Sequence, residues 1–165
     1  MEMKNKMSNI RLLRKPPRIK VLEAIGSIGD QRVKVLDDHR AEVVSSRGDK
    51  VYKVIVEPVE HNVYHAYSSD NGTIFRGYIG YPIIAFLIIK GIIPIDKEVM
   101  KAVTGVPWKD LNERYKRYSI VENIVLNKAE RMGVSREIIM DYINIVMKKL
   151  GLLKIYFVEE LKNKF

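Results

Sequence analysis

The stretch from Pro82 to Lys90 constrains the fold more than any other part of this 165-residue chain. Its residues, Pro-Ile-Ile-Ala-Phe-Leu-Ile-Ile-Lys, would be apolar on every side of a helix, so a helix here must be surrounded by other elements. Proline at the entrance and Gly91 after the end are typical of a helix start and stop. The β-branched residues would also allow a buried strand, and periodicity does not decide between the two. We expect a central helix.

Period-two patterns before this helix predict an antiparallel β-meander. The expected strands are Arg32–Leu36, Ala41–Ser46, Val51–Val56, Val63–Tyr67 and Thr73–Ile79. The last turn contains Asn71-Gly72, the strongest short hairpin signal in the chain. Ahead of the strands we expect a short helix over Arg18–Ile25 that stops at Gly26, with a strand as the alternative.

Helical patterns dominate the last third of the chain. The expected helices are Asp96–Val103, Trp108–Met132 with a joint near Ser119, and Arg136–Leu150 with Ser135 as its N-cap, followed by a strand or frayed helix over Leu152–Phe165. The predicted fold class is therefore α+β, with an antiparallel β-meander packed on a central apolar helix and followed by a C-terminal helical bundle. We expect a flexible basic arm over 1–16, an α+β domain over 17–95, and a helical region over 96–165 packed on it as one unit.

The charge balance points to an anionic partner. The formal net charge is +9 and the pI is about 9.6, and a basic surface attracts polyanions because bound phosphates release condensed counterions. The absence of cysteine excludes disulfides, thiolate nucleophiles and cysteine metal sites, and suits a reducing cytoplasm. No uninterrupted apolar run reaches the roughly 20 residues of a membrane span, so no membrane partner is expected.

Motifs of enzymes are absent from the sequence, which has no glycine-rich phosphate loop, nucleophile elbow or metal-binding helix. The histidines are His39, His61 and His65, and two of them without a third ligand make a poor zinc site. We therefore expect a protein that is not an enzyme, with no catalytic residue, no metal and no cofactor.

The segment from Ala41 to Gly91 resembles the SWIM-type zinc finger, a ββα module found in chromatin remodellers, transposases and small archaeal proteins. Val51-Tyr52-Lys53-Val54-Ile55-Val56 matches its strand, and Gly80-Tyr81-Pro82-Ile83-Ile84-Ala85 matches its helix entry. The zinc ligands are missing, because Gly80 and Pro82 stand in the places of the second cysteine and the histidine. His65 and Tyr67, or their neighbours, stand in those of the Cys-x-Cys pair. The resemblance implies DNA binding or protein docking.

A second pattern resembles a helix-turn-helix. It runs from Ala129 through Gly133 to Ile139, where a small residue, a turn glycine and later apolar residues would lock two helices together. The exposed start of the second helix would present Arg136 and Asn144, which can contact bases, beside acids that repel phosphates. A plain structural hairpin is the favoured interpretation.

Basic and aromatic residues alternate between Trp108 and Tyr118, which favours a surface that stacks bases and neutralises phosphates. Helical spacing also allows Trp108, Leu111, Tyr115 and Tyr118 to be core residues. We expect a non-catalytic nucleic-acid-binding accessory or regulatory protein, the alternative being a protein-interaction or homo-oligomeric module. The cations expected to contact nucleic acid are Arg11, Arg14, Lys15, Arg18, Lys109, Arg114, Lys116, Arg117 and Arg136.

Overall fold

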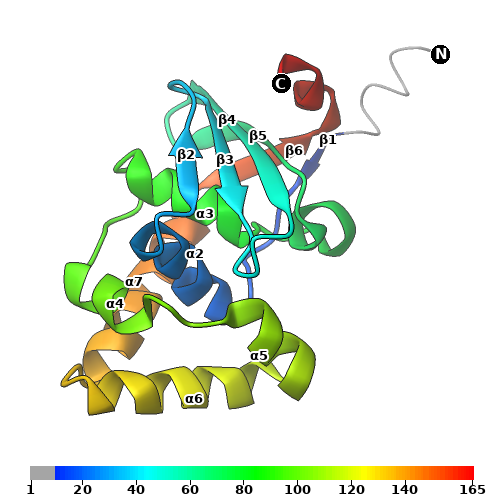
Figure 1. The fold of residues 1–165 in the computed structure, drawn as a ribbon. Helices are drawn as coiled ribbons and strands as arrows, with labels where there is room; N and C mark the ends of the chain where they lie inside the picture. The colour runs from blue at the N-terminus through cyan, green and yellow to red at the C-terminus, as the bar shows by residue number, and fades with distance from the viewer. Residues whose placement is uncertain (1–9) are drawn as a thin grey trace.

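The computed structural model describes residues 10–165 and arranges them around a six-stranded sheet (Figure 1). The strands are β1 (Ile10–Leu12), β2 (Val33–Val35), β3 (Arg40–Val44), β4 (Val51–Glu60), β5 (Val63–Ser68) and β6 (Lys154–Val158). The α-helices are α2 (Ile19–Gly29), α3 (Tyr81–Ile89), α4 (Lys97–Val103), α5 (Trp108–Tyr115), α6 (Tyr118–Arg131) and α7 (Arg136–Leu152). A π-helix, η1 (Gly72–Arg76), and a 3-10 helix, η2 (Glu159–Lys164), complete the chain. The predicted α+β class is confirmed.

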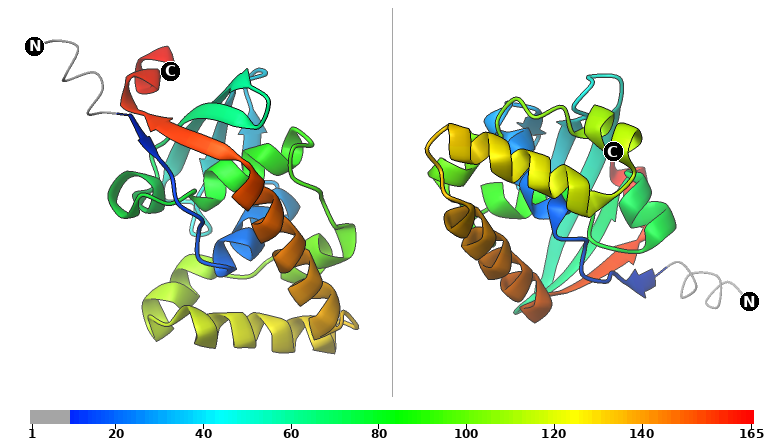
Figure 2. Two further views of the ribbon diagram at one scale, coloured as in Figure 1. Left: turned by 180° about the vertical axis from the view of Figure 1, so that it is seen from behind. Right: turned by 90° about the horizontal axis from the view of Figure 1, so that it is seen from below.

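The sheet combines an antiparallel meander with one parallel pairing. Its strand order is β1-β6-β5-β4-β3-β2, and β2 to β5 form the expected antiparallel meander. Strand β6 lies parallel to β5, and β1 pairs antiparallel with β6, so that Ile10 lies opposite Val158. Figure 2 shows α7 leading directly into β6, which carries β1 on its outer side.

Helix α3 lies at the centre of the molecule, as its all-round apolar sequence predicts. Residues Ile83 to Leu87 are fully buried, and the helix packs between the sheet at β4 and β5 and the helix α2. Val54 and Val56 of β4 belong to this core, whereas Ile55 points to the opposite face, because side chains alternate along a strand. That opposite face is covered at β4 and β5 by η2.

Helix α2 extends further than expected. The stop predicted at Gly26 is wrong, because this glycine lies inside the helix and packs closely against another element. A Cβ at this position would be 2.9 Å from the indole Nε1 of Trp108 and 3.3 Å from the carbonyl oxygen of Val103. The glycine therefore permits close packing instead of ending the helix.

The strand predicted over Thr73–Ile79 is also wrong, and so is the hairpin at Asn71-Gly72. The π-helix η1 occupies residues 72–76 instead. The carboxylate of Asp70 accepts a hydrogen bond from the backbone N–H of Thr73 at 3.0 Å, which favours helical backbone over a hairpin turn. The sheet position beside β5 is taken by β6.

The last third of the chain follows the predicted pattern closely. Asp96 caps α4, and Ser135 caps α7 by accepting from the N–H of Ile138. The expected joint in the long helix separates α5 from α6 at Lys116. Leu152–Phe165 provides the end of α7, the strand β6 and the helix η2.

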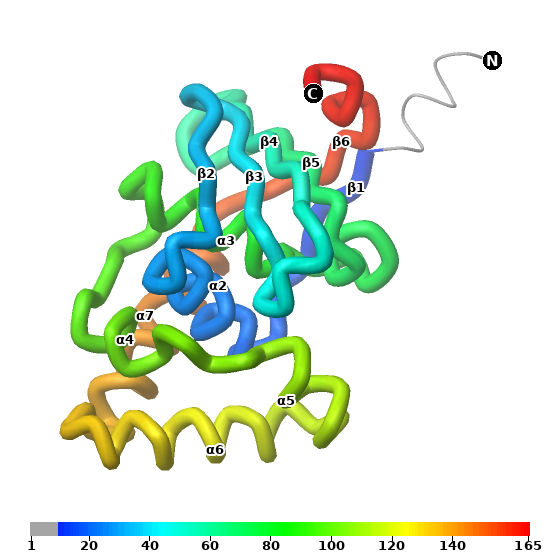
Figure 3. Tube along the Cα trace, viewed as in Figure 1, coloured from blue at the N-terminus to red at the C-terminus, as the bar shows by residue number. Residues whose placement is uncertain are grey.

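The predicted basic arm lies partly outside the described residues, which begin at Ile10. From there the segment forms strand β1 instead of an arm, and Leu13 is buried. Figure 3 shows these first described residues running beside β6. One hydrophobic core contains residues from Leu13 to Phe157, and so joins the two predicted regions. Over residues 10–165, no helix has the length and apolarity needed to cross a membrane.

Replacement of Phe86 tests the central role of α3. Phe86→Ala should lower the free energy of unfolding by about 3–5 kcal/mol, because Phe86 is fully buried and its removal leaves a cavity. Phe75→Ala is the matched control, since Phe75 is 78% exposed and its loss should change stability by less than about 0.5 kcal/mol. Urea unfolding followed by circular dichroism measures both. Similar losses for the two variants would contradict the central position of α3.

Candidate ligand cleft

The turn between β3 and β4 is clamped onto the start of α5. The guanidinium of Arg47 forms ion pairs with Asp110 and Glu113 of α5. Lys109 reaches back to this turn, with its Nζ 3.0 Å from Asp49 Oδ2 and its backbone N–H donating to Ser46 Oγ at 2.9 Å. These contacts hold β3, β4 and α5 around a cavity.

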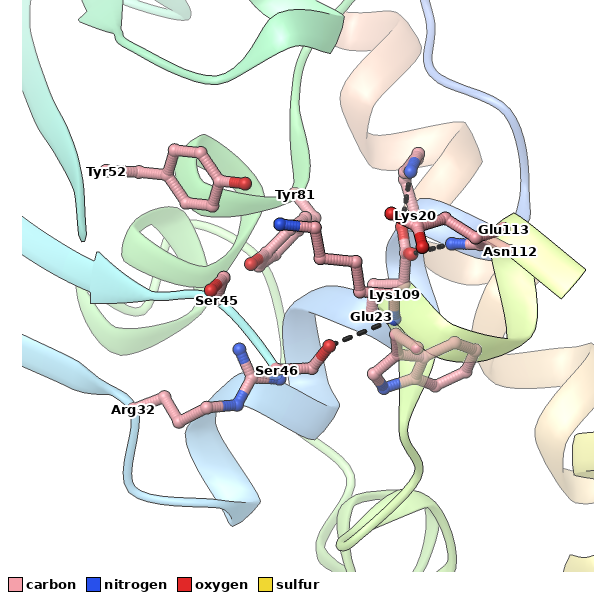
Figure 4. A pocket seen from close by; sticks show the side chains of 11 residues that line it. Lys20, Glu23, Arg32, Ser45, Ser46, Tyr52, Tyr81, Lys109, Asn112 and Glu113 are labelled. Atoms are coloured by element: carbon pink, nitrogen blue, oxygen red, sulfur yellow. Dashed lines mark hydrogen bonds and ion pairs between the residues drawn. The ribbon is translucent and has the colours of Figure 1, made fainter. Parts of the chain in front are cut away.

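This cavity, called here the first pocket, has a volume of about 250 Å³ (Figure 4). It is lined by Lys20, Glu23, Arg32, Ser45, Ser46, Tyr52, Tyr81, Trp108, Lys109, Asn112 and Glu113. The rings of Tyr52 and Tyr81 meet edge to face, with centroids 6.1 Å apart and an interplanar angle of 87°. Trp108 is the only tryptophan of the chain and is almost fully buried.

A buried ion pair forms one wall of the first pocket. Lys20 Nζ lies 2.7 Å from Glu23 Oε2 on helix α2, and Glu23 Oε1 accepts a hydrogen bond from Asn112 Nδ2 at 2.6 Å. The amide oxygen of Asn112 is buried and has no hydrogen-bond partner among residues 10–165. A buried polar atom without a partner is costly, and the indole Nε1 of Trp108 in the same lining is likewise buried without a partner among these residues.

A second pocket of about 230 Å³ adjoins the first, because Lys20, Tyr52 and Tyr81 line both. Its other lining residues are Asp70, Asn71, Gly72, Arg76, Tyr78 and Tyr118. The ammonium group of Lys20 lies 5.2 Å from the centre of the Tyr118 ring, within range of a cation–π contact. The two pockets together are called the tyrosine cleft below.

Three tyrosines of the cleft, Tyr52, Tyr78 and Tyr81, remain neutral phenols at physiological pH. Burial raises the pKa of Tyr81 and of Tyr52. Burial, opposed by Lys20 and aided by Tyr118, raises the pKa of Tyr78 to about 12. Their hydroxyl groups can therefore donate hydrogen bonds and carry no negative charge that would repel an anion.

Lys20 keeps its charge inside the cleft. Burial alone would lower the pKa of its ammonium group, but the charge of Glu23 and the hydrogen bond to it outweigh burial and raise that pKa. Lys20 therefore forms a compensated pair with Glu23 instead of a free positive charge. Perturbed ionisable groups that gather in a cavity are typical of functional sites.

The N-terminus of α3, beside the second pocket, is held by a buried polar cluster. Asp70 accepts hydrogen bonds from the hydroxyl groups of Ser68 and Thr73, and Thr73 Oγ1 accepts from the N–H of Gly80 at 3.1 Å. A Cβ on Gly80 would lie only 2.1 Å from Asp70 Oδ2, so only glycine fits there. A carboxylate at this end of a helix is favoured by the helix dipole.

This cluster lies beside Gly80, one of the positions that the zinc-finger resemblance assigns to a ligand. Ser68 and Asp70 have the spacing of the Cys-x-Cys pair and contact this helix entry through Thr73. Within residues 10–165, no group of three or more histidine, aspartate or glutamate side chains is arranged to hold a metal ion. The resemblance itself stays a prediction.

Helix η1 presents an aromatic ring and arginines beside the second pocket. Arg11 donates from Nη2 to the carbonyl oxygen of Ile74 at 2.6 Å, and Arg14 donates to that of Arg76. Phe75, between these two carbonyl residues, is 78% exposed. A carbonyl oxygen satisfies an N–H donor without neutralising a guanidinium, so the positive charges remain available.

Other predicted cations are neutralised by acids. Arg18 lies 3.7 Å from Glu122 and donates to Asn144, while Lys109 pairs with Asp49 as described above. Arg136 pairs with Glu130 across the α6–α7 turn at 2.6 Å. The structure therefore uses these three cations to hold elements together.

The remaining predicted cations have no carboxylate within ion-pair distance among residues 10–165. The side chain of Lys15 lies against Gly151 of α7, and the guanidinium of Arg114 lies over the ring of Tyr115. Lys116 ends α5 in a left-handed conformation, and Arg117 caps α6 immediately before Tyr118. Arg117 and Lys116 are thereby placed at the α5–α6 joint, next to a lining residue of the second pocket.

The helix-turn-helix pattern corresponds to α6, a turn and α7. Ala129 and Ile139 are fully buried and Gly133 has a φ of 86°, as the pattern expects. The two side chains able to contact bases are occupied, because Arg136 bonds Glu130 and Asn144 accepts from Arg18. The geometry favours the structural hairpin.

Several residues of the cleft were not among the predicted contacts. Lys20 and Glu23 lie three residues apart on α2, and Asn112 approaches them from the distant helix α5, which no local pattern indicates. Trp108 and Tyr118 were indicated by the alternation of basic and aromatic residues, although the burial of Trp108 was expected only in the core interpretation.

Comparison with protein families assigns the chain to one family. The model of a family described as Uncharacterised conserved protein UCP014422 matches residues 13–156. The chain belongs to that family. The matched segment contains every lining residue of the tyrosine cleft, together with Arg14 and Arg117 but not Arg11. No curated protein and no solved structure matches the chain.

Titration of Asp49 tests the clamp between the β3–β4 turn and α5. Hydrogen bonds from Ser45 and then Lys109 lower the pKa of Asp49 from its ordinary 3.8 to about 2. Because the folded pKa is the lower one, this carboxylate stabilises the fold above roughly pH 4 and loses that effect as the pH falls through about 2. A carboxyl NMR titration should show a midpoint near 2.

Two serine variants test whether the hydrogen bond from Ser45 lowers the pKa of Asp49. Ser45→Ala removes the donor to Asp49 and should move the midpoint upward, toward 3.8. Ser46→Ala is the matched control, since Ser46 bonds the backbone of Lys109 and should leave the midpoint in place. A midpoint near 3.8 in the unmodified protein would rule out the clamp in solution.

Proposed function

We propose that this protein is a non-catalytic nucleic-acid-binding protein that holds single-stranded nucleic acid along the tyrosine cleft. The proposal is carried by one observation: exposed aromatic rings and arginines without a carboxylate partner lie on η1 and at the α5–α6 joint, the two segments that bring Arg76 and Tyr118 to the second pocket. Single-stranded nucleic acid is bound by basic grooves that follow the backbone and by aromatic rings that stack bases.

Phosphates are assigned to the cations whose charge is not offset. Arg11 and Arg14 are anchored on the carbonyl groups of η1, and Arg76 lines the second pocket. Arg117 and Lys116 lie at the α5–α6 joint, next to Tyr118, which lines the same pocket as Arg76. These contacts neutralise phosphates without selecting a base.

Bases are assigned to the exposed aromatic rings. Phe75 is 78% exposed on η1 and Tyr118 is 43% exposed at the start of α6, so each has a ring face available to solvent. An apolar ring left exposed between arginines is unfavourable in the free protein and favourable once a base covers it. Stacking tolerates any base, which suits a sequence-independent binder.

The alternative of a strand-pairing module receives less support from the geometry. The edge strands β1 and β2 are each three residues long, so they offer few backbone groups to an added strand. Lys34 in β2 is exposed, and lysine on an edge discourages pairing.

The salt dependence of binding tests the phosphate contacts. The affinity for a labelled mixed-sequence single strand, measured by fluorescence anisotropy, should fall steeply between about 50 and about 200 mM salt. Arg14→Ala and Arg117→Ala should each reduce the slope of log affinity against log salt by about 0.7. Arg136→Ala is the control, because Arg136 is neutralised by Glu130 and its loss should leave the slope unchanged. Absence of binding at the lowest salt would exclude the proposal.

Replacement of Phe75 tests the stacking contact. Phe75→Ala should weaken single-strand binding by about 1–3 kcal/mol, the usual contribution of one stacked base, while the salt slope stays the same. Ile145→Ala is the matched control, since Ile145 is 54% exposed on α7, away from η1. Competition anisotropy measures both. Equal effects of the two substitutions would show that Phe75 has no specific role.

A further inference from the structure

Helix α7 carries a stripe of exposed apolar side chains. Ile138, Ile145 and Leu152 are 37%, 54% and 61% exposed, and Figure 2 shows α7 along one edge of the molecule. They follow one another at intervals of seven residues, which is two helical turns with a drift of only about 20°. The three side chains therefore form one line, called here the α7 stripe, along the length of the helix.

The α7 stripe is separate from the face of the helix that packs into the core. Ile139, Ile143 and Val146 are fully buried on that other face, where α7 contacts α2, α4 and α6. Folding of one chain therefore leaves the stripe in contact with solvent. Apolar residues that recur every seven positions are typical of the seam between two packed helices, so the stripe has the pattern of a seam whose second helix is not provided by residues 10–165.

Two opposite charges accompany the stripe at the same interval. Asp141 and Lys148 are both exposed and are seven residues apart on α7. They are separated by about 10 Å along the helix axis, at 1.5 Å per residue, so they do not pair with each other. Neither has an ion-pair partner elsewhere among residues 10–165. At about 100° per residue, both lie on the same flank of the stripe.

We propose that the α7 stripe is the interface of a homodimer, in which α7 packs against α7 of a second copy in antiparallel orientation. A two-fold axis beside Ile145 places this residue against its own counterpart. Ile138 is seven residues before Ile145 and Leu152 is seven residues after it, so each Ile138 lies opposite Leu152 of the other copy. A two-fold interface requires a patch that is complementary to itself, and this equal spacing meets the requirement.

The charges favour a second copy in this orientation. Asp141 is four residues before Ile145 and Lys148 is three residues after it. In the antiparallel pair each Asp141 therefore lies within about 1.5 Å, the rise of one residue, of the level of Lys148 in the other copy. Both are on the same flank, so two ion pairs form across the seam. In a parallel pair Asp141 would lie level with Asp141 and gain no counter-charge.

The size of the stripe predicts a reversible dimer. A stripe along one helix buries less than the roughly 800 Å² per partner of a standard interface. No lining residue of the tyrosine cleft is on α7, so both clefts stay open in the dimer. A nucleic-acid strand short enough for one cleft binds monomer and dimer alike. This inference therefore stands or falls independently of the proposed function.

Sedimentation equilibrium tests the interface. The unmodified protein should approach twice the 19.1 kDa mass of one chain as its concentration rises. Ile145→Asp should weaken association at least about a hundredfold, because two carboxylates would meet at the axis and like charges across an interface are strongly unfavourable. Ile120→Asp is the matched control, since Ile120 is exposed on α6, and its dimer should persist.

Two results of this experiment would overturn the inference. One is the mass of a single chain for the unmodified protein at every concentration, which would leave the stripe to a different partner. The other is a dimer that survives Ile145→Asp, which would place the contact on another face. Circular dichroism checks that Ile145→Asp is folded, as expected for a substitution at an exposed position.

A charge exchange tests the antiparallel orientation. Asp141→Lys and Lys148→Asp should each weaken the dimer about tenfold or more, because like charges then meet across the seam. The variant with both substitutions reverses the two charges together and should restore the association of the unmodified protein. Glu98→Lys is the matched control, since Glu98 is exposed on α4 and its replacement should leave the dimer unchanged. Failure of the double variant to restore the dimer would overturn the antiparallel pairing.

Discussion

The enclosure of helix α3 is the constraint on which the other features depend. A helix that is apolar on every side is stable only when it is covered on every side, and here the sheet covers it at β4 and β5 while α2 covers it opposite. Its first turn cannot be covered by apolar groups alone, because backbone N–H groups there need acceptors. Thr73 Oγ1 accepts from the N–H of Gly80, and Asp70 accepts from the hydroxyl group of Thr73, so this cluster places η1 and Tyr81 at one end of the helix. The tyrosine cleft is built around that end.

The positive potential at the surface depends on which cations are paired with carboxylates. Arg18, Lys109 and Arg136 are each paired with a carboxylate, so they connect elements and contribute little to the field outside. Arg11 and Arg14 are held by carbonyl oxygens, which fix their positions and leave their charge in place. A net charge of +9 therefore does not describe a uniformly basic surface.

Local sequence patterns predicted the central helix, the meander and the helices of the last third, because each depends on neighbours within a few residues. The parallel pairing of β6 with β5 was not predicted. These strands are far apart in the sequence, and no local pattern indicates that two distant segments are neighbours in a sheet. The Asn71-Gly72 hairpin failed because one side chain, Asp70, redirected the backbone. The cleft was predicted only in part. Trp108 and Tyr118 belong to a recognisable alternation of basic and aromatic residues, whereas the pair of Lys20 and Glu23 on α2 meets Asn112 only through the fold.

The strand order also dictates when the protein can be completed during translation. Strand β1 has β6 as its sheet neighbour, although β6 is synthesised after every other strand. The meander and α3 can assemble on the ribosome while the segment from Ile10 to Leu13 still lacks β6, its neighbour in the sheet. Arg11, which lies opposite Phe157 of β6, would reach its place on η1 last, so a nascent chain would expose this cation until synthesis of β6 is finished.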